Sequence, residues 1–446
     1  MLIESPELAL ESRIELIEAA RTSIDIQYFI WKNDEAGILL VESLLAAADR
    51  GVRVRALIDD FDMEGLIGRI AALNRHPNLE IRIFNPFNLQ QSFRLHILRL
   101  AEFVIDGNRL NHRMHNKLLI ADGQMGMLVG RNMGNAYFGR SDRRNFLDTD
   151  ILMTGPILGE LSDGFEAYWN SRLARPAERM LDLTFSRMSL ERVRKRIDNR
   201  LARHLDLRKL TDGSPSIEFF QEFLRSPSYE WASGVIDEPS VGWFEDATEL
   251  ADQLSEIASR AEKEVIVATP YLIPTKKALE IARTLVSRGV KISVLTNSLA
   301  SNDVVLAQAA YSRMRKEILD TGVKIYELKG NPAMAEGQAV SAMSMHSKYI
   351  LLDDDIVFMG SQNLDPRSLY INTELGVVIK SKEITSDLKH SFNQLILPEN
   401  AWRVERSADG FLWHSSDGVM KKEPARSAWQ RFQHSLMKLI PISDQL

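Results

Sequence analysis

The sequence contains no cysteine and no long apolar run. Without cysteine, its 446 residues provide no disulfide, no thiol nucleophile and no cysteine-ligated zinc or iron–sulfur site. No window of about 18 residues is both apolar and uncharged, so we expect no membrane-spanning helix. The opening stretch carries acidic residues where a signal peptide needs a basic region, so we expect no export signal.

Basic residues do not outnumber acidic ones, with 55 Lys and Arg against 61 Asp and Glu. The formal net charge is −6, which gives no general attraction to polyanions and makes nucleic acid an unlikely partner. Hydrophobic residues make up 45% and charged residues 26%, the balance of a chain that folds almost throughout. Its length exceeds one ordinary hydrophobic core, which favours two domains or one duplicated domain.

An octet occurs twice in this otherwise unrepetitive chain. HNKLLIAD spans His115 to Asp122, and HSKYILLD spans His346 to Asp353. Each octet follows a similar series of elements, which begins with an alternating, strand-like run at residues 22–30 or 264–273. In each half a helical stretch then ends at a glycine, Gly51 or Gly289, before a second strand. The pattern predicts an α/β fold of two similar mixed sheets flanked by helices.

Four segments follow from this organisation. The two similar halves are expected at residues 1–170 and 246–400, with a helical, basic insertion at 171–245 and a tail with an amphipathic helix at 401–446. Between Arg172 and Lys209 there are twelve basic and five acidic residues, which we interpret first as a solvated linker. A face for anionic lipid head groups is the alternative interpretation.

The repeated octets bring together a histidine and a lysine. Alternate residues of a strand share a face, so His115 should project with Lys117, and His346 with Lys348. Lysine can hold phosphate oxygens while a neutral imidazole acts as a nucleophile or a proton donor, the needs of phosphoryl transfer at a diester. This scheme requires no metal, and an ammonium group on the same face disfavours one.

Each octet leads into a glycine-containing turn with an asparagine. The turns read GRNMGN from Gly130 and GSQNLDPRS from Gly360, and Asn132 and Asn363 can donate to phosphate from them. Further along each half a carboxylate, Asp148 or Glu374, could hold one ring nitrogen of a histidine. Asp150 competes with Asp148 for this role.

These motifs together resemble the phospholipase D superfamily, and within it the bacterial cardiolipin synthases of the C type. The similar segments are LNHRMHNK, GRNMGNAYFG, FNPF, LTNSLASNDV and QNLDPRSLYINTE. The resemblance implies a duplicated phospholipase D fold whose halves are related by a pseudo-twofold axis and share one active site. It implies transfer of a phosphatidyl group from phosphatidylglycerol or phosphatidylethanolamine to phosphatidylglycerol through a phosphohistidine. By this analogy His115 is the nucleophile and His346 the general acid, and neither a cofactor nor a metal takes part.

The resemblance also implies a peripheral enzyme at the cytoplasmic membrane, with phospholipid substrates and an anionic membrane surface as partners. It permits a partner protein. Asp122 and Asp353 belong to the family's motif and are grouped with the site, but they lie off the histidine face, so we expect them to hydrogen-bond within the fold. The first turn departs from the pattern because Arg131 stands where the second turn has Ser361, and both Arg131 and Ser361 are candidate contacts for a lipid phosphate.

Three alternatives stay open. Water could replace the alcohol, giving a phospholipase D hydrolase or another phosphodiesterase, or the chain could be an inactive scaffold that binds anionic lipid.

Tyr28 and Tyr271 could line the pocket, although aromatic strand residues are more often core. The tail places an apolar stripe on one helical face, which we interpret first as packed on its own domain and second as inserted in a membrane surface: Trp429, Phe432, Leu436, Leu439 and Ile440.

Overall fold

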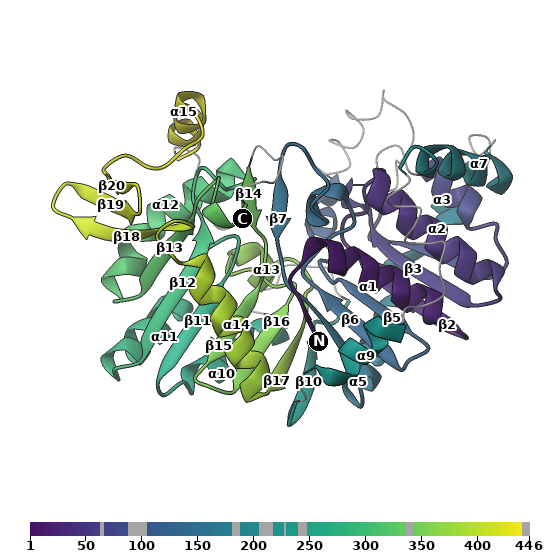
Figure 1. Cartoon of the computed structure of the whole chain (residues 1–446), viewed down its shortest axis with the longest axis horizontal. Coiled ribbons are helices and arrows are strands. Elements are labelled where there is room, and N and C mark those ends of the chain that lie inside the picture. The colour runs from purple at the N-terminus through teal and green to yellow at the C-terminus, as the bar shows by residue number, and fades with distance from the viewer. Residues whose placement is uncertain are drawn as a thin grey trace.

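Two β-sheets stand side by side in the computed structural model (Figure 1). The structure describes residues 1–62, 67–87, 105–180, 188–204, 217–226, 229–239, 248–335 and 342–438. In Figure 1 the purple and blue first half lies on the right and the green and yellow second half on the left, with β7 (Asn145–Leu147) and β14 (Met343–Met345) between them. No helix within these described ranges is both long and apolar enough to cross a membrane.

The first sheet has eight strands in the order β1-β8-β6-β5-β2-β3-β4-β9. Strands β2, β3 and β4 are parallel, and the other pairings are antiparallel. In chain order they are β1 (Leu2–Ile3), β2 (Ser23–Tyr28), β3 (Arg53–Asp59), β4 (Leu79–Phe84), β5 (Leu118–Ala121), β6 (Met125–Val129), β8 (Asp150–Thr154) and β9 (Ala174–Pro176).

The second sheet has ten strands in the order β10-β17-β16-β15-β11-β12-β13-β18-β19-β20. Its run β17-β16-β15-β11-β12-β13 repeats the run β8-β6-β5-β2-β3-β4 of the first sheet, so the predicted duplicated α/β fold is confirmed. Its strands are β10 (Trp231–Ile236), β11 (Glu264–Ala268), β12 (Lys291–Asn297), β13 (Lys324–Leu328), β15 (Tyr349–Leu352), β16 (Ile356–Gly360), β17 (Leu375–Lys380), β18 (Ala401–Ser407), β19 (Gly410–Ser415) and β20 (Gly418–Met420).

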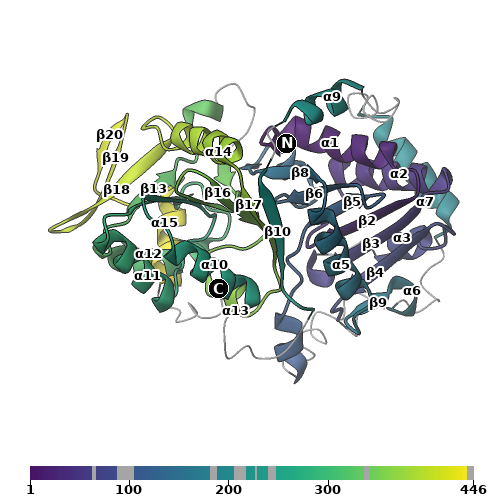
Figure 2. The same ribbon diagram turned by 90° about the horizontal axis from the view of Figure 1, so that it is seen from below.

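Helices flank both sheets, as Figure 2 shows from below. Around the first sheet lie α1 (Pro6–Ala19), α2 (Glu35–Asp49), α3 (Ile67–Leu73), α5 (Ile157–Trp169), α6 (Ala177–Met180), α7 (Leu190–Leu201) and α9 (Ile217–Arg225). With the second sheet lie α10 (Glu249–Ser259), α11 (Lys276–Ser287), α12 (Val305–Asp320), α13 (Pro366–Tyr370), α14 (Lys382–Leu395) and α15 (Ala428–Met437).

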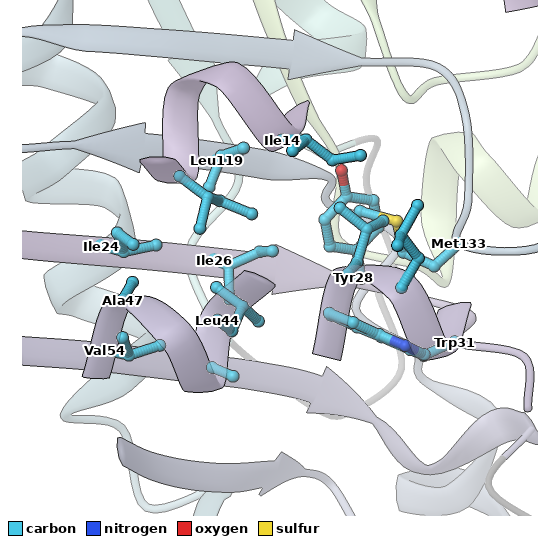
Figure 3. Packing of buried hydrophobic residues seen from close by; sticks show 14 of the residues in the cluster. Ile14, Ile24, Ile26, Tyr28, Trp31, Leu44, Ala47, Val54, Leu119 and Met133 are labelled. Carbon is cyan, nitrogen blue, oxygen red and sulfur yellow. The ribbon is translucent and has the colours of Figure 1, made fainter. Parts of the chain in front are cut away.

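Helix α2 shows how the local sequence sets the fold. The Asp34 side chain caps its first turn by accepting from the Gly37 amide, and Gly51 follows its last turn at a φ of 93°. Gly289 follows α11 in the same way at 88°, as predicted for both glycines. Side chains of α2 pack on β2 and β3 in the core of the first half (Figure 3), where each fully buried leucine or isoleucine contributes about 1.5–3 kcal/mol.

A second hydrophobic core belongs to both halves. One cluster includes Leu118 and Leu128 from the first sheet together with Leu351 and Val377 from the second. Because buried apolar side chains pack closely and resist deformation, this shared core fixes the position of one half against the other.

Sheet pairing crosses the predicted segment boundaries. Within 171–245, β9 joins the first sheet and β10 the second, and in the tail β18 pairs with β13. The basic stretch lies partly outside the described residues, including Lys209, but its described helix α7 packs on the first half. There Arg194 and Arg200 form ion pairs with Asp49 and Glu35, so part of the basic surplus is neutralised.

Candidate active site

Both histidines lie in extended segments directly before a strand, at the boundary between the halves. The amide of His115, just ahead of β5, donates to the carbonyl of Thr373 at 2.9 Å. The amide of His346, just ahead of β15, donates to the carbonyl of Leu147 at 2.7 Å. Each histidine is thus tied by its backbone to the opposite half, a pairing that the sequence did not reveal.

The register of these pairings places each histidine beside a carboxylate. Met345 is the parallel partner of Leu147, and Met114 forms a parallel bridge with Thr373. Since parallel segments run in the same direction, the next residues along also lie next to each other: His346 with Asp148, and His115 with Glu374.

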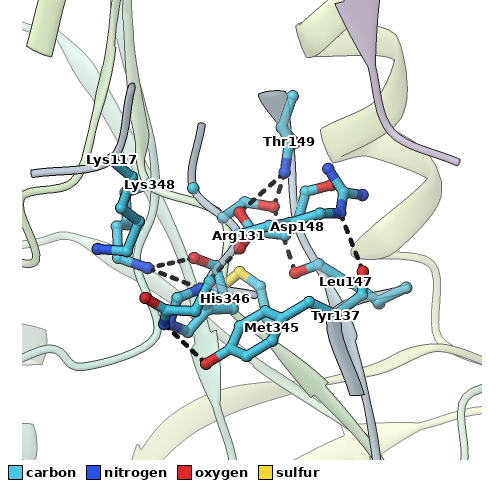
Figure 4. A network of polar contacts seen from close by, with 12 residues as sticks. Lys117, Arg131, Tyr137, Leu147, Asp148, Thr149, Met345, His346 and Lys348 are labelled. Carbon is cyan, nitrogen blue, oxygen red and sulfur yellow. Dashed lines mark hydrogen bonds and ion pairs between the residues drawn. The ribbon is translucent and has the colours of Figure 1, made fainter. Parts of the chain in front are cut away.

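The side chains complete the contact that this register prepares. Nδ1 of His346 lies 2.6 Å from Oδ2 of Asp148 (Figure 4), and Nδ1 of His115 lies 2.9 Å from Oε2 of Glu374. A carboxylate at Nδ1 places the proton of a neutral imidazole on that nitrogen and leaves a lone pair on Nε2. Asp148, and not its rival Asp150, therefore faces a histidine.

Burial keeps both imidazoles neutral. It lowers the pKa of His115 to about 4 and that of His346 in the same direction, with the nearby lysines adding to both effects. Burial alone would raise the pKa of Asp148 and of Glu374, but their histidines and the site lysines hold both values below the ordinary range. At neutral pH the site pairs neutral imidazoles with ionised carboxylates.

The two lysines bring positive charge to the same place. Lys117 and Lys348 are almost wholly buried, and each ammonium donates to the carbonyl of its own histidine. Burial lowers the pKa of both, and proximity to Lys348 helps to bring that of Lys117 to about 7. Asp148 and Glu374 favour the charged form of both lysines, and the two ammonium groups together are suited to hold a phosphate.

Aromatic rings hold the imidazoles from their other sides. The rings of Phe29 and His115 meet edge to face with their centroids 4.9 Å apart. The ring centroids of Tyr137 and Phe146 each lie 5.3 Å from that of His346. These contacts went unrecognised in the sequence, where Tyr28 drew attention instead of its neighbour Phe29. Tyr28 is the last residue of β2 and Phe29 follows it, and the two side chains contact different neighbours.

The two tyrosines singled out in the sequence have other contacts. Tyr28 is fully buried and its hydroxyl accepts from Arg13, so it belongs to the core (Figure 3). The hydroxyl of Tyr271 donates to the carboxylate of Asp303 at 3.0 Å.

Gly130 is required by the position of Asp148. A Cβ atom at residue 130 would lie 2.1 Å from Oδ1 of Asp148, far inside van der Waals contact.

The two asparagines in the glycine turns, Asn132 and Asn363, differ in their contacts. Asn132 is engaged at both ends of its amide, by Ile30 and Tyr137, whereas Oδ1 of the buried Asn363 has no partner in the described part of the chain. Phosphate binding through the amide nitrogen of either asparagine stays a prediction.

Arg131 does not face the site, which corrects the expectation that it contacts a lipid phosphate. Its side chain is fully buried and donates to four backbone carbonyls, those of Ile3, Glu4, Tyr137 and Asp148. It also pairs with Asp150 at 2.9 Å. The guanidinium therefore holds the N-terminal strand and the Asp148 segment together.

Ser361, the counterpart of Arg131, contacts a catalytic candidate. Its hydroxyl donates to the carboxylate of Glu374, which also accepts from His115. Ser361 therefore orients the carboxylate, and a phosphate contact is not needed to explain it.

Asp122 and Asp353 lie at the opposite ends of β5 and β15 from the histidines. The Asp122 carboxylate accepts from the amides of residues 21–23, and that of Asp353 from residues 262–264. Both aspartates have a positive φ, 55° and 54°. Their grouping with the catalytic residues is corrected: they hydrogen-bond within the fold, as their spacing predicts, and fix the entry to β2 and β11.

Two buried aspartates position the site and were missed in the sequence. Asp59 accepts from the amide of Met114, next to His115, and Asp237 accepts from the amide of Glu374. Burial raises the pKa of Asp59 to about 6 and that of Asp237 to about 7. The acidic end of the strand Arg53–Asp59 is a sequence signal that could have indicated Asp59. No feature of the sequence around Asp237 indicates its role.

Comparisons with known proteins agree with this geometry. The family profile described as "Cardiolipin synthase, PLD-like domain" matches residues 13–169 and 254–396, the parts that carry both histidines. Cardiolipin synthase C of Escherichia coli K12 is 36% identical, over 97% of this chain and 93% of its own. Cardiolipin synthase 1 of Bacillus anthracis is 25% identical, over 96% of this chain and 69% of its own. The crystal structure of phosphatidylserine synthase from Haemophilus influenzae superposes with a TM-score of 0.65 at 14% identity, covering 100% of this chain and 95% of the other, which shows a shared fold.

Proposed function

The chain is an enzyme of the phospholipase D superfamily and belongs to its cardiolipin synthase, phospholipase D-like domain family, and we propose that it makes cardiolipin by phosphatidyl transfer. The phosphatidyl donor is phosphatidylglycerol or phosphatidylethanolamine, and the acceptor is phosphatidylglycerol. Glycerol or ethanolamine is released, according to the donor.

One observation carries the proposal: two imidazoles, each hydrogen-bonded through Nδ1 to a carboxylate of the opposite half, stand beside two buried lysines. A neutral imidazole with a free Nε2 is a competent nucleophile toward phosphorus. The ammonium groups of Lys117 and Lys348, with the amide of Asn363, bind the phosphate and stabilise the charge that develops on its oxygens.

In the first step, Nε2 of His115 attacks phosphorus and the bond from phosphorus to the head-group oxygen breaks. His346 gives a proton from Nε2 to that oxygen. Burial disfavours the imidazolium form of His346 in the free enzyme, but the negative charge of the bound phosphodiester favours it, as does Asp148 at Nδ1.

In the second step, a hydroxyl group of phosphatidylglycerol gives its proton to Nε2 of His346 and attacks the phosphohistidine. The bond between phosphorus and His115 breaks, and cardiolipin leaves. Water in place of this hydroxyl would give phosphatidic acid, so access of lipid and exclusion of water decide between synthase and hydrolase.

The substrates place the protein at a membrane surface. Because the proposed substrates are membrane lipids, we propose a peripheral association with the anionic face of the cytoplasmic membrane.

The test is incubation of the purified protein with phosphatidylglycerol vesicles, with and without phosphatidylethanolamine, followed by mass spectrometry of the lipids. Cardiolipin should form with the wild type and disappear with both His115→Ala and His346→Ala. Phosphatidic acid alone would make the protein a hydrolase, and lipid binding without any product would make it a scaffold. Since the lysines supply the charge, activity should persist in excess chelator, and its loss there would count against this mechanism.

A further inference from the structure

Helix α15 exposes its apolar face to solvent and buries its polar face, the reverse of an ordinary surface helix. Its apolar residues Trp429, Phe432 and Leu436 are 63%, 57% and 56% exposed, whereas the polar Gln430 and His434 are 5% and 2% exposed. The prediction that this stripe packs on its own domain is therefore wrong for the three described residues. Leu439 and Ile440, the last two of the predicted stripe, lie outside the described residues.

Buried hydrogen bonds explain why the polar face turns inward. Nε2 of Gln430 donates to the carbonyl of Leu299 at 2.6 Å, and Nε2 of His434 lies 3.0 Å from the hydroxyl of Ser312 on α12. Glu423, which precedes the helix, forms an ion pair with Arg315 of α12 at 2.8 Å. Since these buried groups would lose their partners if the helix rolled over, its orientation is fixed.

The outward face is a continuous apolar stripe. Residues 429, 432 and 436 follow the spacing of one helical face, and the rings of Trp429 and Phe432 stack with centroids 5.4 Å apart. Large apolar side chains gathered on an exposed surface mark a place where something else binds.

The charge around the stripe indicates what binds there. Residues 421–438 contain five basic side chains and one acidic side chain, in a protein whose formal charge is −6. The acidic one, Glu423, faces inward to Arg315, while Lys421, Lys422 and Arg426 are exposed. An apolar stripe with aromatic residues beside exposed cations is the composition of a helix that lies in the interface of an anionic bilayer.

We infer that α15 docks the protein on an anionic phospholipid bilayer, with Trp429, Phe432 and Leu436 inserted among the lipids and the neighbouring basic residues on their head groups. The inference rests on the proposed function, which places the substrates in that bilayer. In Figure 1, α15 projects from the upper edge of the molecule, where β7 and β14 also lie. These two strands carry Phe146 and Met345, next to His346. In Figure 2, which is seen from below, α15 lies on the far side.

Another exposed ring, that of Phe61, lies close to His115. Phe61 is 61% exposed and stacks on Phe29, whose ring contacts His115. The rings of Phe61 and Phe29 thus link the protein surface to His115.

The experiment measures flotation of the full chain with vesicles of phosphatidylglycerol and phosphatidylcholine, compared with phosphatidylcholine alone. The variant replaces Trp429, Phe432 and Leu436 with serine, and its melting temperature should match that of the wild type because all three side chains are exposed. We expect its binding to the anionic vesicles to fall at least tenfold, with turnover on those vesicles falling in parallel.

Trp231→Ser is the matched control. Trp231 is also exposed, at 45%, but lies on β10 at the lower edge of Figure 1, and its replacement should leave vesicle binding intact. A second variant, with Lys421, Lys422 and Arg426 replaced by glutamine, should weaken binding to anionic vesicles while leaving the weak binding to phosphatidylcholine alone unchanged.

Two outcomes overturn the inference. Triple-serine protein that floats as well as the wild type would show that α15 does not insert. A wild type that is dimeric in solution, with a monomeric triple-serine variant, would show that a second copy of the chain covers the stripe. The proposed function fails separately, if wild-type protein makes no cardiolipin in detergent-mixed micelles, where docking is not required.

Discussion

The imidazole of His346 and the carboxylate of Asp148 are 2.6 Å apart across 198 residues of chain, and they belong to different halves of the protein. His115 and Glu374 form the reciprocal pair at 2.9 Å, across 259 residues. Each half thus contributes the histidine of one pair and the carboxylate of the other, and the site exists only where the halves meet.

Replacing either carboxylate should disable the histidine of the other half. For Asp148→Asn and Glu374→Gln we expect kcat to fall by about 10²–10⁴, because each loses the charge that stabilises an imidazolium. The protein should also show two low-field proton resonances from the Nδ1–H groups. Asp148→Asn should remove the resonance of His346 and keep that of His115, and Glu374→Gln should do the reverse; loss of both in either variant would show that the pairs are not independent.

Gly130→Ala should act through Asp148. The added methyl group would overlap the Asp148 carboxylate and push it from His346, so we expect kcat to fall by about 10² or more. Gly159 in α5 is the matched control, because a Cβ there meets no atom within 4 Å, and Gly159→Ala should keep full activity and gain up to about 1 kcal/mol of stability. Since both changes act on one contact, Gly130→Ala combined with Asp148→Asn should be little worse than Asp148→Asn alone; multiplied losses would refute the shared cause.

Arg131→Met should destabilise the protein without weakening lipid binding. It leaves four carbonyls and part of the charge of Asp150 without a partner in the interior, for an expected loss of about 3–5 kcal/mol in the free energy of unfolding. The exposed Arg143 serves for comparison, and Arg143→Met should change stability by less than about 0.5 kcal/mol. Denaturant unfolding and KM for phospholipid measure the two effects. A raised KM with normal stability would show that Arg131 binds the lipid phosphate.

The pH dependence of kcat/KM should show an unusually acidic plateau. Neutral His115 is the nucleophile, and because its pKa is lowered to about 4 it stays neutral at pH 5, where an ordinary histidine is largely protonated. Lys117 loses its charge as the pH rises past its pKa of about 7, and burial lowers the pKa of His346, the proton donor of the first step. We therefore expect kcat/KM to fall as the pH rises from this plateau. Mixed micelles of fixed composition keep the lipid surface constant during the measurement. An acidic limb near pH 6.5 would contradict the role of burial at His115.

Local pattern was sufficient for much of the fold. The βαβ units, the glycines at residues 51 and 289 and the paired histidine–lysine motifs are visible because strand alternation, helix ends and a repeated octet are short-range signals. The two histidines and the two carboxylates could also be identified from the sequence. Which carboxylate pairs with which histidine could not, because the pairing of His346 with Asp148 depends on how two distant segments align.

Burial was the other unpredictable quantity. The spacing of Trp429, Phe432 and Leu436 indicates one helical face but cannot tell whether that face is covered, and here Gln430 and His434 occupy the covered side. Arg131 looked available to a ligand for a similar reason. Only the fold shows that four carbonyls already surround it.

The crossed pairs also bear on how such a chain evolves. A single ancestral unit of this kind would have depended on an identical twin, so that every mutation struck both sides of the pocket at once. In one chain that carries both copies this constraint is released, and the turns after the two octets differ in role: Arg131 anchors the N-terminal strand, while Ser361 orients Glu374. Selection can then shape an attacking half and a proton-transferring half separately.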